Sequence, residues 1–223
     1  ISIDRDELVK IATGGIDRPA KGPLSPANPY FVDVSQYLRY DPDKARKLLD
    51  DAGWSEVGAD GIRVKDGTRL SLRGPQDTAA WQVLQDQWKK IGVELRLEPP
   101  LAAEANQKLL SGEYDITYWY HSTPDPDVLR ANYGVKTGSN RSFIAPDDAT
   151  GQELDRLLQE QNKVLDKAKR KALVEQAAKL LVEQAYVIPV ANDVDVWAHT
   201  PQLQGIKAVG LDQYLYNAWL QKP

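Results

Sequence analysis

The chain has 223 residues, of which 42% are hydrophobic and 27% are charged, which is ordinary for a globular protein that can bury a substantial core. Its net charge of −4 argues against nucleic acid as a partner, because phosphate neutralisation needs a basic surface. Cysteine is absent, so disulfides, thiolate metal ligands and cysteine nucleophiles are excluded.

The sequence has no pattern typical of a targeting segment or a membrane-spanning segment. No run of about 18 apolar residues occurs, so no membrane-spanning segment is predicted. A signal-peptide pattern is also missing. The chain starts at Ile1 and contains no methionine, and we expect it to be part of a longer protein.

The predicted helices combine capping residues with apolar side chains at helical spacing. Asp4 and Glu7 form a capping-box pattern, and Asp41 followed by Pro42 is typical of a helix start. Asp77 is the expected cap of a helix with two tryptophans on one face. The expected helices are residues 4–12, 41–52, 77–91, 101–110, 150–165 and 167–185.

The predicted strands are short and alternate with these helices. The first two form an expected hairpin around the turn at 65–68, and alternation or β-branched content predicts the others. The expected strands are residues 62–64, 70–72, 93–97, 115–120, 187–190 and 194–197. This pattern predicts an α/β fold in which helices flank a mixed sheet. The proline-rich segment 17–40 is long enough for a loop that lines a site.

The aromatic run from Tyr118 to Tyr120 ends one predicted strand, just before a proline-rich turn. Ligands of open α/β sheets gather at the carboxyl ends of strands, where aromatic rings suit peptides, sugars or aromatic solutes. Successive strand residues face opposite sides, so Trp119 is expected to point away from its two tyrosine neighbours. A core role for one face of this strand is the alternative.

Carboxylates near these aromatics leave a catalytic alternative open. Glu113, Asp115, Asp125 and Asp127 could include the acid and base of a glycoside hydrolase. The last two lie in a Pro-Asp-Pro-Asp turn, where aspartate commonly bonds backbone amides, so turn formation or ligand contact is the favoured interpretation. The same turn has too few ligands for a known calcium loop.

Metal and cofactor motifs are missing from the sequence. His121 and His199 are too far apart in the chain to form a local zinc-binding pair, and His121 is interpreted as a polar loop residue. Neither a Gly-x-Ser-x-Gly elbow nor a phosphate-binding glycine loop occurs. We therefore expect no catalysis, no metal and no cofactor.

Short motifs extend over nearly the whole chain in a specific order. They are Ile3-Asp4-Arg5, Tyr40-Asp41-Pro42-Asp43-Lys44-Ala45-Arg46-Lys47-Leu48-Leu49, Ala52-Gly53-Trp54, Leu84-Gln85-Asp86-Gln87-Trp88, Ile91-Gly92-Val93, Gly112-Glu113-Tyr114-Asp115, Pro124-Asp125-Pro126-Asp127, Asn140, Leu154-Asp155-Arg156-Leu157-Leu158, Ile188-Pro189 and Gly205. In this order and spacing, the chain resembles the family 5 (peptide/nickel/oligopeptide type) extracellular solute-binding proteins of bacterial ABC importers.

This resemblance implies the C-terminal lobe of a class II periplasmic-binding-protein-like fold, whose two lobes close on the ligand at a hinge. Residues 1–199 would be the ligand-binding lobe, and residues 200–223 a tail that returns toward the missing N-terminal lobe. The implied function is capture of a peptide or other small polar organic solute. The implied partners are ABC transporter permease subunits, and the implied location is extracytoplasmic, in the periplasm or as a lipoprotein.

The resemblance also implies a ligand surface. In peptide-binding members, a pocket tryptophan is followed three residues later by an Asp that pairs with the peptide's α-amino group. Trp119 matches the tryptophan, but Ser122 stands at the Asp position, which makes oligosaccharides or opines alternatives to peptides. A single lobe is expected to bind weakly or to serve only as a structural module. The expected ligand contacts are Trp119, Tyr120, His121, Ser122, Asp125, Asn140, Leu24 and Ser25.

Overall fold

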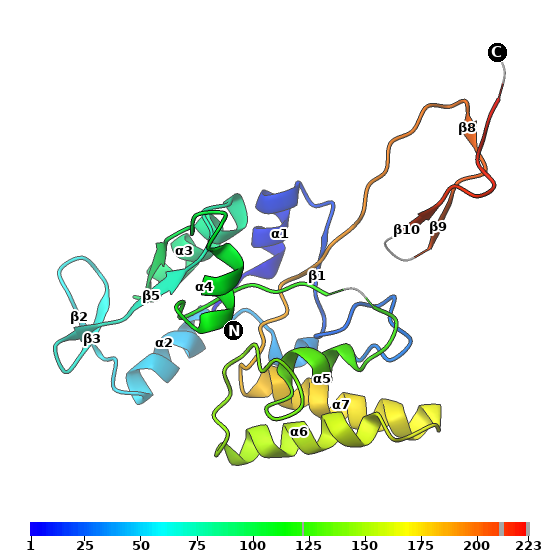
Figure 1. Cartoon of the computed structure of the whole chain (residues 1–223). Coiled ribbons are helices and arrows are strands. Elements are labelled where there is room, and N and C mark those ends of the chain that lie inside the picture. Colours follow the sequence, from blue (N-terminus) through cyan, green and yellow to red (C-terminus); the bar gives the residue numbers. More distant parts are fainter. Residues whose placement is uncertain (122, 210–211, 222–223) are drawn as a thin grey trace.

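Helices account for most of the regular structure in the computed structural model, which describes residues 1–121, 123–209 and 212–221 (Figure 1). The helices are α1 (Arg5–Thr13), α2 (Pro42–Asp51), α3 (Ala79–Lys89), α4 (Ala105–Ser111), α5 (Val128–Tyr133), α6 (Ala149–Gln161) and α7 (Lys167–Glu183), with a 3₁₀ turn at Ser35–Tyr37. The strands are β1 (Arg18–Pro19), β2 (Glu56–Val57), β3 (Arg63–Lys65), β4 (Thr68–Arg69), β5 (Ser71–Gly74), β6 (Glu94–Leu97), β7 (Ala191–Asn192), β8 (Leu203–Gln204), β9 (Lys207–Val209), β10 (Asp212–Tyr214) and β11 (Trp219–Leu220).

Two predicted N-caps are confirmed, although the capping box at Asp4 is only half formed, because the amide of Asp4 donates to Oε1 of Gln87 and not to Glu7. The carboxylate of Asp4 accepts a hydrogen bond of 3.0 Å from the amide of Glu7, and that of Asp41 accepts one of 2.9 Å from the amide of Lys44. Pro42 occupies the first position of α2, where the amide it lacks would have had no helical partner. These helix starts depend on residues three apart, which explains why the sequence alone reveals them.

The predicted cap of α3 is wrong. Thr78 is the N-cap, and it makes no side-chain capping bond. Asp77 lies one residue too early to reach the first helical amides, and its carboxylate instead accepts a 2.7 Å hydrogen bond from the side chain of Gln82. The helix α5 was not predicted, because the proline-rich turn before it has no helical periodicity.

The mixed character of the sheet structure comes from one parallel pair, β5 with β6, among antiparallel pairs. Helix α3 connects the two parallel strands, which is the crossover that such a pair requires. Gly74 ends β5 under the indole of Trp81, and a Cβ at this position would overlap that ring. In place of the single predicted sheet, the described chain forms several small sheets within an α/β fold.

The predicted hairpin is confirmed at its turn and wrong in its second strand. Strand β3 pairs with β4 through Asp66 and Gly67, which both have a positive φ, as a tight two-residue turn requires. Leu70 then switches partners: its amide donates to the carbonyl of Arg63, while its own carbonyl accepts from the amide of Glu94. Strand β5 consequently pairs with β6 and not with β3.

Three other strand predictions are wrong. Residues 115–120 form no strand, and only Asp115 and Ile116 donate amides to the carbonyl of Arg73 beside β5. Residues 187–190 and 194–197 also form no strand, and pairing nearby is limited to β7 with β1. Their β-branched and aromatic side chains favour extended structure, but a strand forms only where a partner strand lies alongside it.

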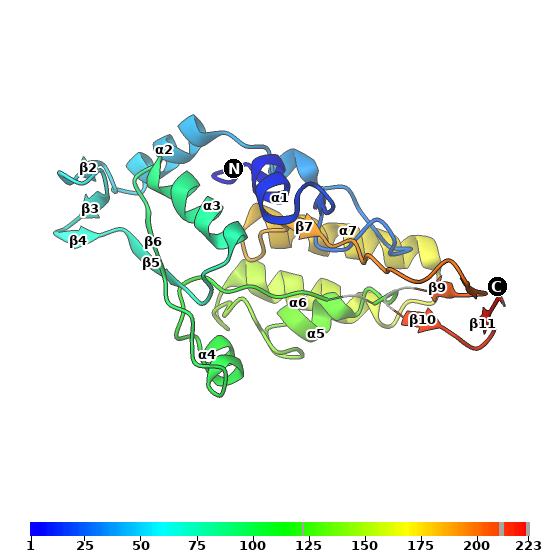
Figure 2. The same ribbon diagram turned by 90° about the horizontal axis from the view of Figure 1, so that it is seen from above.

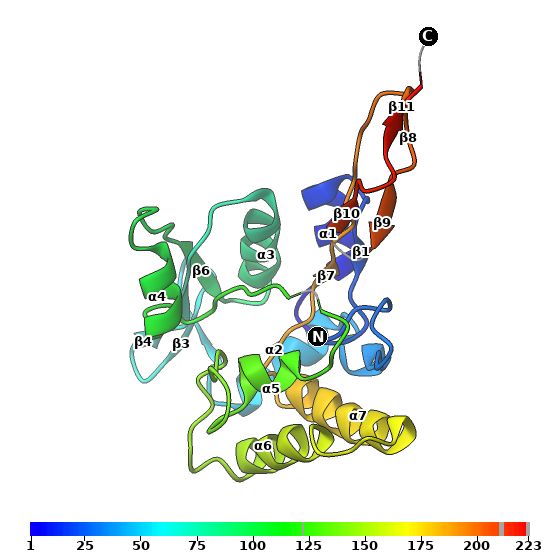
Figure 3. The same cartoon turned by 45° about the vertical axis from the view of Figure 1, so that its right-hand side comes forward.

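Two large apolar clusters pack the body of the protein, and a smaller third one contains Val34, Leu38 and Val182. The first joins α1 and α3 to β5 and β6 and buries Trp81 and Leu95. The second joins α5 to α6 and α7 and completely buries Leu129, Leu154 and Leu181. Figure 3 shows the two helical groups apart from each other, and Figure 2 shows α6 and α7 side by side. Irregular segments connect the two groups.

Arg5 holds several of these irregular segments together. Its guanidinium donates hydrogen bonds to the carbonyls of Ala20, Leu38 and Pro189, the last two at 3.0 and 3.5 Å. Ala20 and Leu38 lie near the two ends of the proline-rich segment 17–40, and Pro189 lies in the segment before β7. One side chain of α1 therefore fixes both ends of the proline-rich segment to the chain before β7.

The tail after residue 199 extends away from both helical groups (Figure 1). In it, β8 pairs with β11 and β9 pairs with β10, both antiparallel. Within the described part of the chain, none of the three apolar clusters includes a tail residue. No described helix has both the length and the apolar content to cross a membrane. The domain boundary at 199/200 stays a prediction.

We expect Arg5→Lys to lower the free energy of unfolding by about 2 kcal/mol, because an ammonium group cannot bond three separated carbonyls and leaves some of them without a partner. Urea unfolding followed by circular dichroism measures this change. Arg18→Lys is the matched control, since Arg18 is exposed and bonds carbonyls of its own turn. Equal stability losses in the two variants would contradict the connecting role of Arg5.

Candidate functional site

The aromatic run lies in the irregular segment between α4 and α5. Trp119 is 45% exposed and Tyr120 is 77% exposed. Their rings stack with centroids 6.4 Å apart and an interplanar angle of 18°. The expectation that these two side chains point in opposite directions is wrong, because it assumed a strand that does not form. Two adjacent aromatic side chains are thus available at the surface.

Arg141 covers the ring of Trp119. Its guanidinium carbon lies 3.3 Å from the ring centroid, a stacked cation–π arrangement. Its Nε donates a 2.9 Å hydrogen bond to Oδ1 of Asn132, a buried residue of α5. The sequence analysis missed Arg141, although it follows Asn140 directly, because no local pattern indicates which distant ring an arginine will contact.

His121 connects the aromatic segment to the proline-rich segment. Its Nε2 lies 2.9 Å from the carbonyl of Pro23 and donates to it, and its ring meets Tyr133 edge-on. Nδ1 is buried without a hydrogen-bond partner in the described structure. Burial lowers the pKa of His121, because removing the imidazolium from water disfavours the charged form. A second link joins the same segments, because Asn28 donates to the carbonyl of Thr123 at 2.9 Å.

Leu24 and Ser25, the two expected ligand contacts in the proline-rich segment, differ in their exposure. Leu24 is 4% exposed and packs in the second apolar cluster, so its side chain offers little surface in this conformation. Ser25 beside it is exposed. The position of Ser122 lies outside the described residues. The ligand roles of all three residues stay predictions.

The remaining expected contacts already have partners within the chain. The side-chain amide of Asn140 donates to the carbonyl of Ile144 at 2.8 Å and accepts from its amide at 3.0 Å, which closes a local loop. Asp125 forms a 2.7 Å ion pair with Arg170 of α7. The structure therefore groups Trp119 with Tyr120, while Asn140 and Asp125 bond elsewhere; their ligand roles stay predictions.

The carboxylates of the catalytic alternative are mostly engaged in ion pairs. Asp115 lies 3.3 Å from Arg73, and Asp127 lies 2.7 Å from Arg130. The backbone amide of Asp127, followed by Arg170, lowers the pKa of Asp125. A general acid needs a raised pKa, so this carboxyl group is unsuited to protonate a leaving group. Among the described residues, no cluster of histidine and acidic side chains has the makeup of a metal site.

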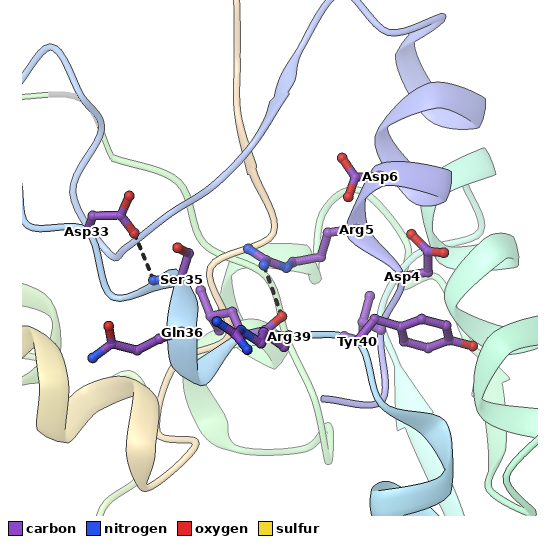
Figure 4. A pocket seen from close by; sticks show the side chains of 10 residues that line it. Asp4, Arg5, Asp6, Asp33, Ser35, Gln36, Arg39 and Tyr40 are labelled. Atoms are coloured by element: carbon purple, nitrogen blue, oxygen red, sulfur yellow. Dashed lines mark hydrogen bonds between the residues drawn. The ribbon is translucent and has the colours of Figure 1, made fainter.

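A separate hollow of about 630 Å³ lies where α1 meets residues 33–40. Figure 4 shows Arg5, Arg39 and Tyr40 among the side chains that line it. None of its lining residues belongs to the aromatic segment. The guanidinium of Arg5 already donates its hydrogen bonds to backbone carbonyls, so this hollow results from the packing of irregular chain around α1. The exposed aromatic surface is therefore the stronger candidate for a ligand site.

Comparisons with known proteins agree with the motifs. Residues 1–141 match the model described as "Bacterial extracellular solute-binding proteins, family 5 Middle". The chain is similar to heme-binding protein A of Haemophilus influenzae, with 28% identity over 92% of this chain and 37% of that protein. It is also similar to the oligopeptide-binding protein OppA of Bacillus subtilis, with 27% identity over 99% of this chain and 41% of that protein.

A solved structure has the same fold. The oligopeptide-binding protein AppA of Bacillus subtilis, in complex with a nonapeptide, matches 99% of this chain and 46% of its own at a TM-score of 0.75 and 22% identity. The α/β fold expected from the resemblance is thereby confirmed. The chain spans about two fifths of the length of the curated relatives that it matches.

We expect acid to destabilise the protein partly through His121. Because burial lowers its folded-state pKa, the unfolded chain takes up a proton first, so this contribution to stability is present above pH about 6.5 and is lost as the pH falls through the lowered folded-state pKa. His121→Gln should reduce the pH dependence of the urea midpoint between pH 7.5 and 5. The exposed His199 provides the control variant His199→Gln, which should keep the original dependence. An unchanged dependence in His121→Gln would contradict this assignment.

Proposed function

Because this chain belongs to the family 5 bacterial extracellular solute-binding proteins, we propose that it is the C-terminal lobe of the substrate-binding component of an ABC importer. In this proposal, residues 1–199 form the ligand-binding lobe. Residues 200–223 return toward an N-terminal lobe, and their extension away from both apolar clusters supports that division. The partial coverage of the relatives agrees with a missing second lobe.

The observation that carries the proposal is the exposed pair Trp119 and Tyr120. Large aromatic side chains are costly to leave in water, and a contiguous exposed pair is typical of a binding surface. Closure of a second lobe over this surface would bury both rings against the ligand. Ligand contacts to both lobes then stabilise the closed state, which couples capture to a hinge motion.

The proposed ligand is a peptide or another small polar organic solute. The names of the relatives themselves differ, one being called heme-binding and the others oligopeptide-binding, so family membership leaves the ligand open. The serine at position 122, where an amine-pairing aspartate is expected in peptide receptors, keeps oligosaccharides and opines as alternatives.

A binding role without catalysis is part of the proposal. The relatives are named as binding proteins. Of the carboxylates in the hydrolase alternative, Asp115 and Asp125 are paired with arginines, which favours charge balance in a loop over proton transfer. We assign neither a metal nor a cofactor to the lobe.

The proposed partners are the permease subunits of the importer and the N-terminal lobe of the same protein. The family is described as extracellular, and we place this receptor outside the cytoplasm, either in the periplasm or attached to the membrane by a lipid.

We expect Trp119→Ala in the complete protein to weaken ligand affinity about thirtyfold, since a central aromatic contact is worth about 2 kcal/mol. Thermal shift against peptides, oligosaccharides and opines first finds the ligand, which raises the midpoint by binding only the folded state. Tyr40→Ala is the control, because Tyr40 is equally exposed at 44% but lines the separate hollow. Unchanged affinity in Trp119→Ala, or no shift with any ligand class, would argue against the proposal.

The isolated chain of residues 1–223 is expected to bind the same ligand at least about a hundredfold more weakly than the complete protein, because it lacks the contacts of the second lobe. Isothermal titration of both proteins makes the comparison. Similar affinities would show that this lobe needs no partner lobe.

A further inference from the structure

Charge balance around the aromatic surface is uneven. Between residues 113 and 199 the sequence has four arginines. Three form ion pairs, namely Arg130 with Asp127, Arg156 with Glu153, and Arg170 with Asp125. Arg141 has no carboxylate within ion-pair distance in the part of the chain that the structure describes, and it is the arginine that lies on Trp119. Arg141 is therefore the arginine of this region whose charge is not balanced by a described carboxylate.

The guanidinium of Arg141 is held in a defined orientation. Its flat face stacks at 3.3 Å on Trp119, and its Nε donates to Oδ1 of Asn132 at 2.9 Å. The backbone amide of Arg141 also donates to the carbonyl of Asn132, at 2.8 Å. Asn132 is only 7% exposed, and its own amide group donates to the carbonyl of Val128. The anchor of the guanidinium is thus itself fixed in α5.

Stacking leaves the hydrogen-bonding edge of the guanidinium available. The N–H groups of an arginine lie in the plane of the group, so a ring against its face does not compete for them. Within the described residues, Nη1 and Nη2 of Arg141 donate to no protein acceptor. A planar or tetrahedral anion can accept two parallel hydrogen bonds from such an edge.

We propose that Arg141, oriented by Trp119 and Asn132, binds an anionic group of the captured solute, a carboxylate or a phosphate. This inference rests on the proposed receptor function and names its substrate class as acidic solutes. Trp119 then acts partly as a positioning residue, since one face of its ring is covered by the guanidinium. Closure over this site would remove water from the ion pair and strengthen it.

The test is isothermal titration of the complete protein with matched acidic and neutral probes. The peptide-like pair is N-acetyl-dialanine and its C-terminal amide. The sugar set is glucuronate and glucose 6-phosphate against glucose, which separates carboxylate from phosphate. We expect at least one acid to bind roughly tenfold to a hundredfold more tightly than its neutral counterpart, as hydrogen bonds to a charged group imply.

Three variants separate charge from folding. Arg141→Gln should abolish the preference for the acid, so that the acid and its neutral counterpart bind with similar affinities. Asn132→Asp keeps the side-chain shape and puts a carboxylate beside Nε, so it should weaken acid binding about tenfold by neutralising Arg141 internally. Because an aspartate cannot donate to the carbonyl of Val128 as Asn132 does, its urea midpoint is measured to verify that the variant is folded. Arg156→Gln is the matched control, because Arg156 is already paired on α6, and it should retain the preference.

The outcomes separate a failure of the anion site from a failure of the receptor function. Equal binding of acids and neutral probes, or a preference that survives in Arg141→Gln, overturns the anion site and leaves the receptor function standing. Absence of binding by every probe counts against both. Loss of the acid preference in Arg141→Gln and Asn132→Asp, with the preference retained in Arg156→Gln, supports the site.

Discussion

The hydrogen bonds of Arg5 are the constraint on which the arrangement of the irregular segments depends. Ala20, Leu38 and Pro189 present carbonyl groups that belong to no helix or sheet ladder, and buried carbonyls without donors are costly. A guanidinium has several donors on a rigid frame, so a single side chain can satisfy carbonyls from three directions. Through this group, α1 holds the proline-rich segment against the chain that enters β7.

The position of the proline-rich segment in turn determines the candidate site. Once Ala20 is fixed, the following residues reach the aromatic loop, where His121 bonds to Pro23 and Asn28 bonds to Thr123. These contacts anchor the loop at two residues that lie just before its Pro-Asp-Pro-Asp turn. Trp119 and Tyr120 remain exposed because the loop is held by its neighbours and not by burial of its own rings.

The binding chemistry of the aromatic surface follows from how charged side chains are distributed around the aromatic loop. Aspartates of the turn pair with arginines of α5 and α7, which ties the loop to the second apolar cluster. Arg141 is held by an aromatic ring and an amide in place of a carboxylate. A receptor lobe organised in this way offers an aromatic surface together with a cationic group, a combination suited to solutes that carry both apolar parts and an acidic group.

The sequence by itself determined the features that depend on neighbours along the chain. The caps at Asp4 and Asp41 and the two helices α6 and α7 were predicted because their hydrogen bonds and apolar faces repeat within one or two turns. Only the tertiary structure decided which extended segments became strands and that Arg141 lies on Trp119. Strand pairing and side-chain stacking require a partner from elsewhere in the chain, and residue propensities do not identify that partner.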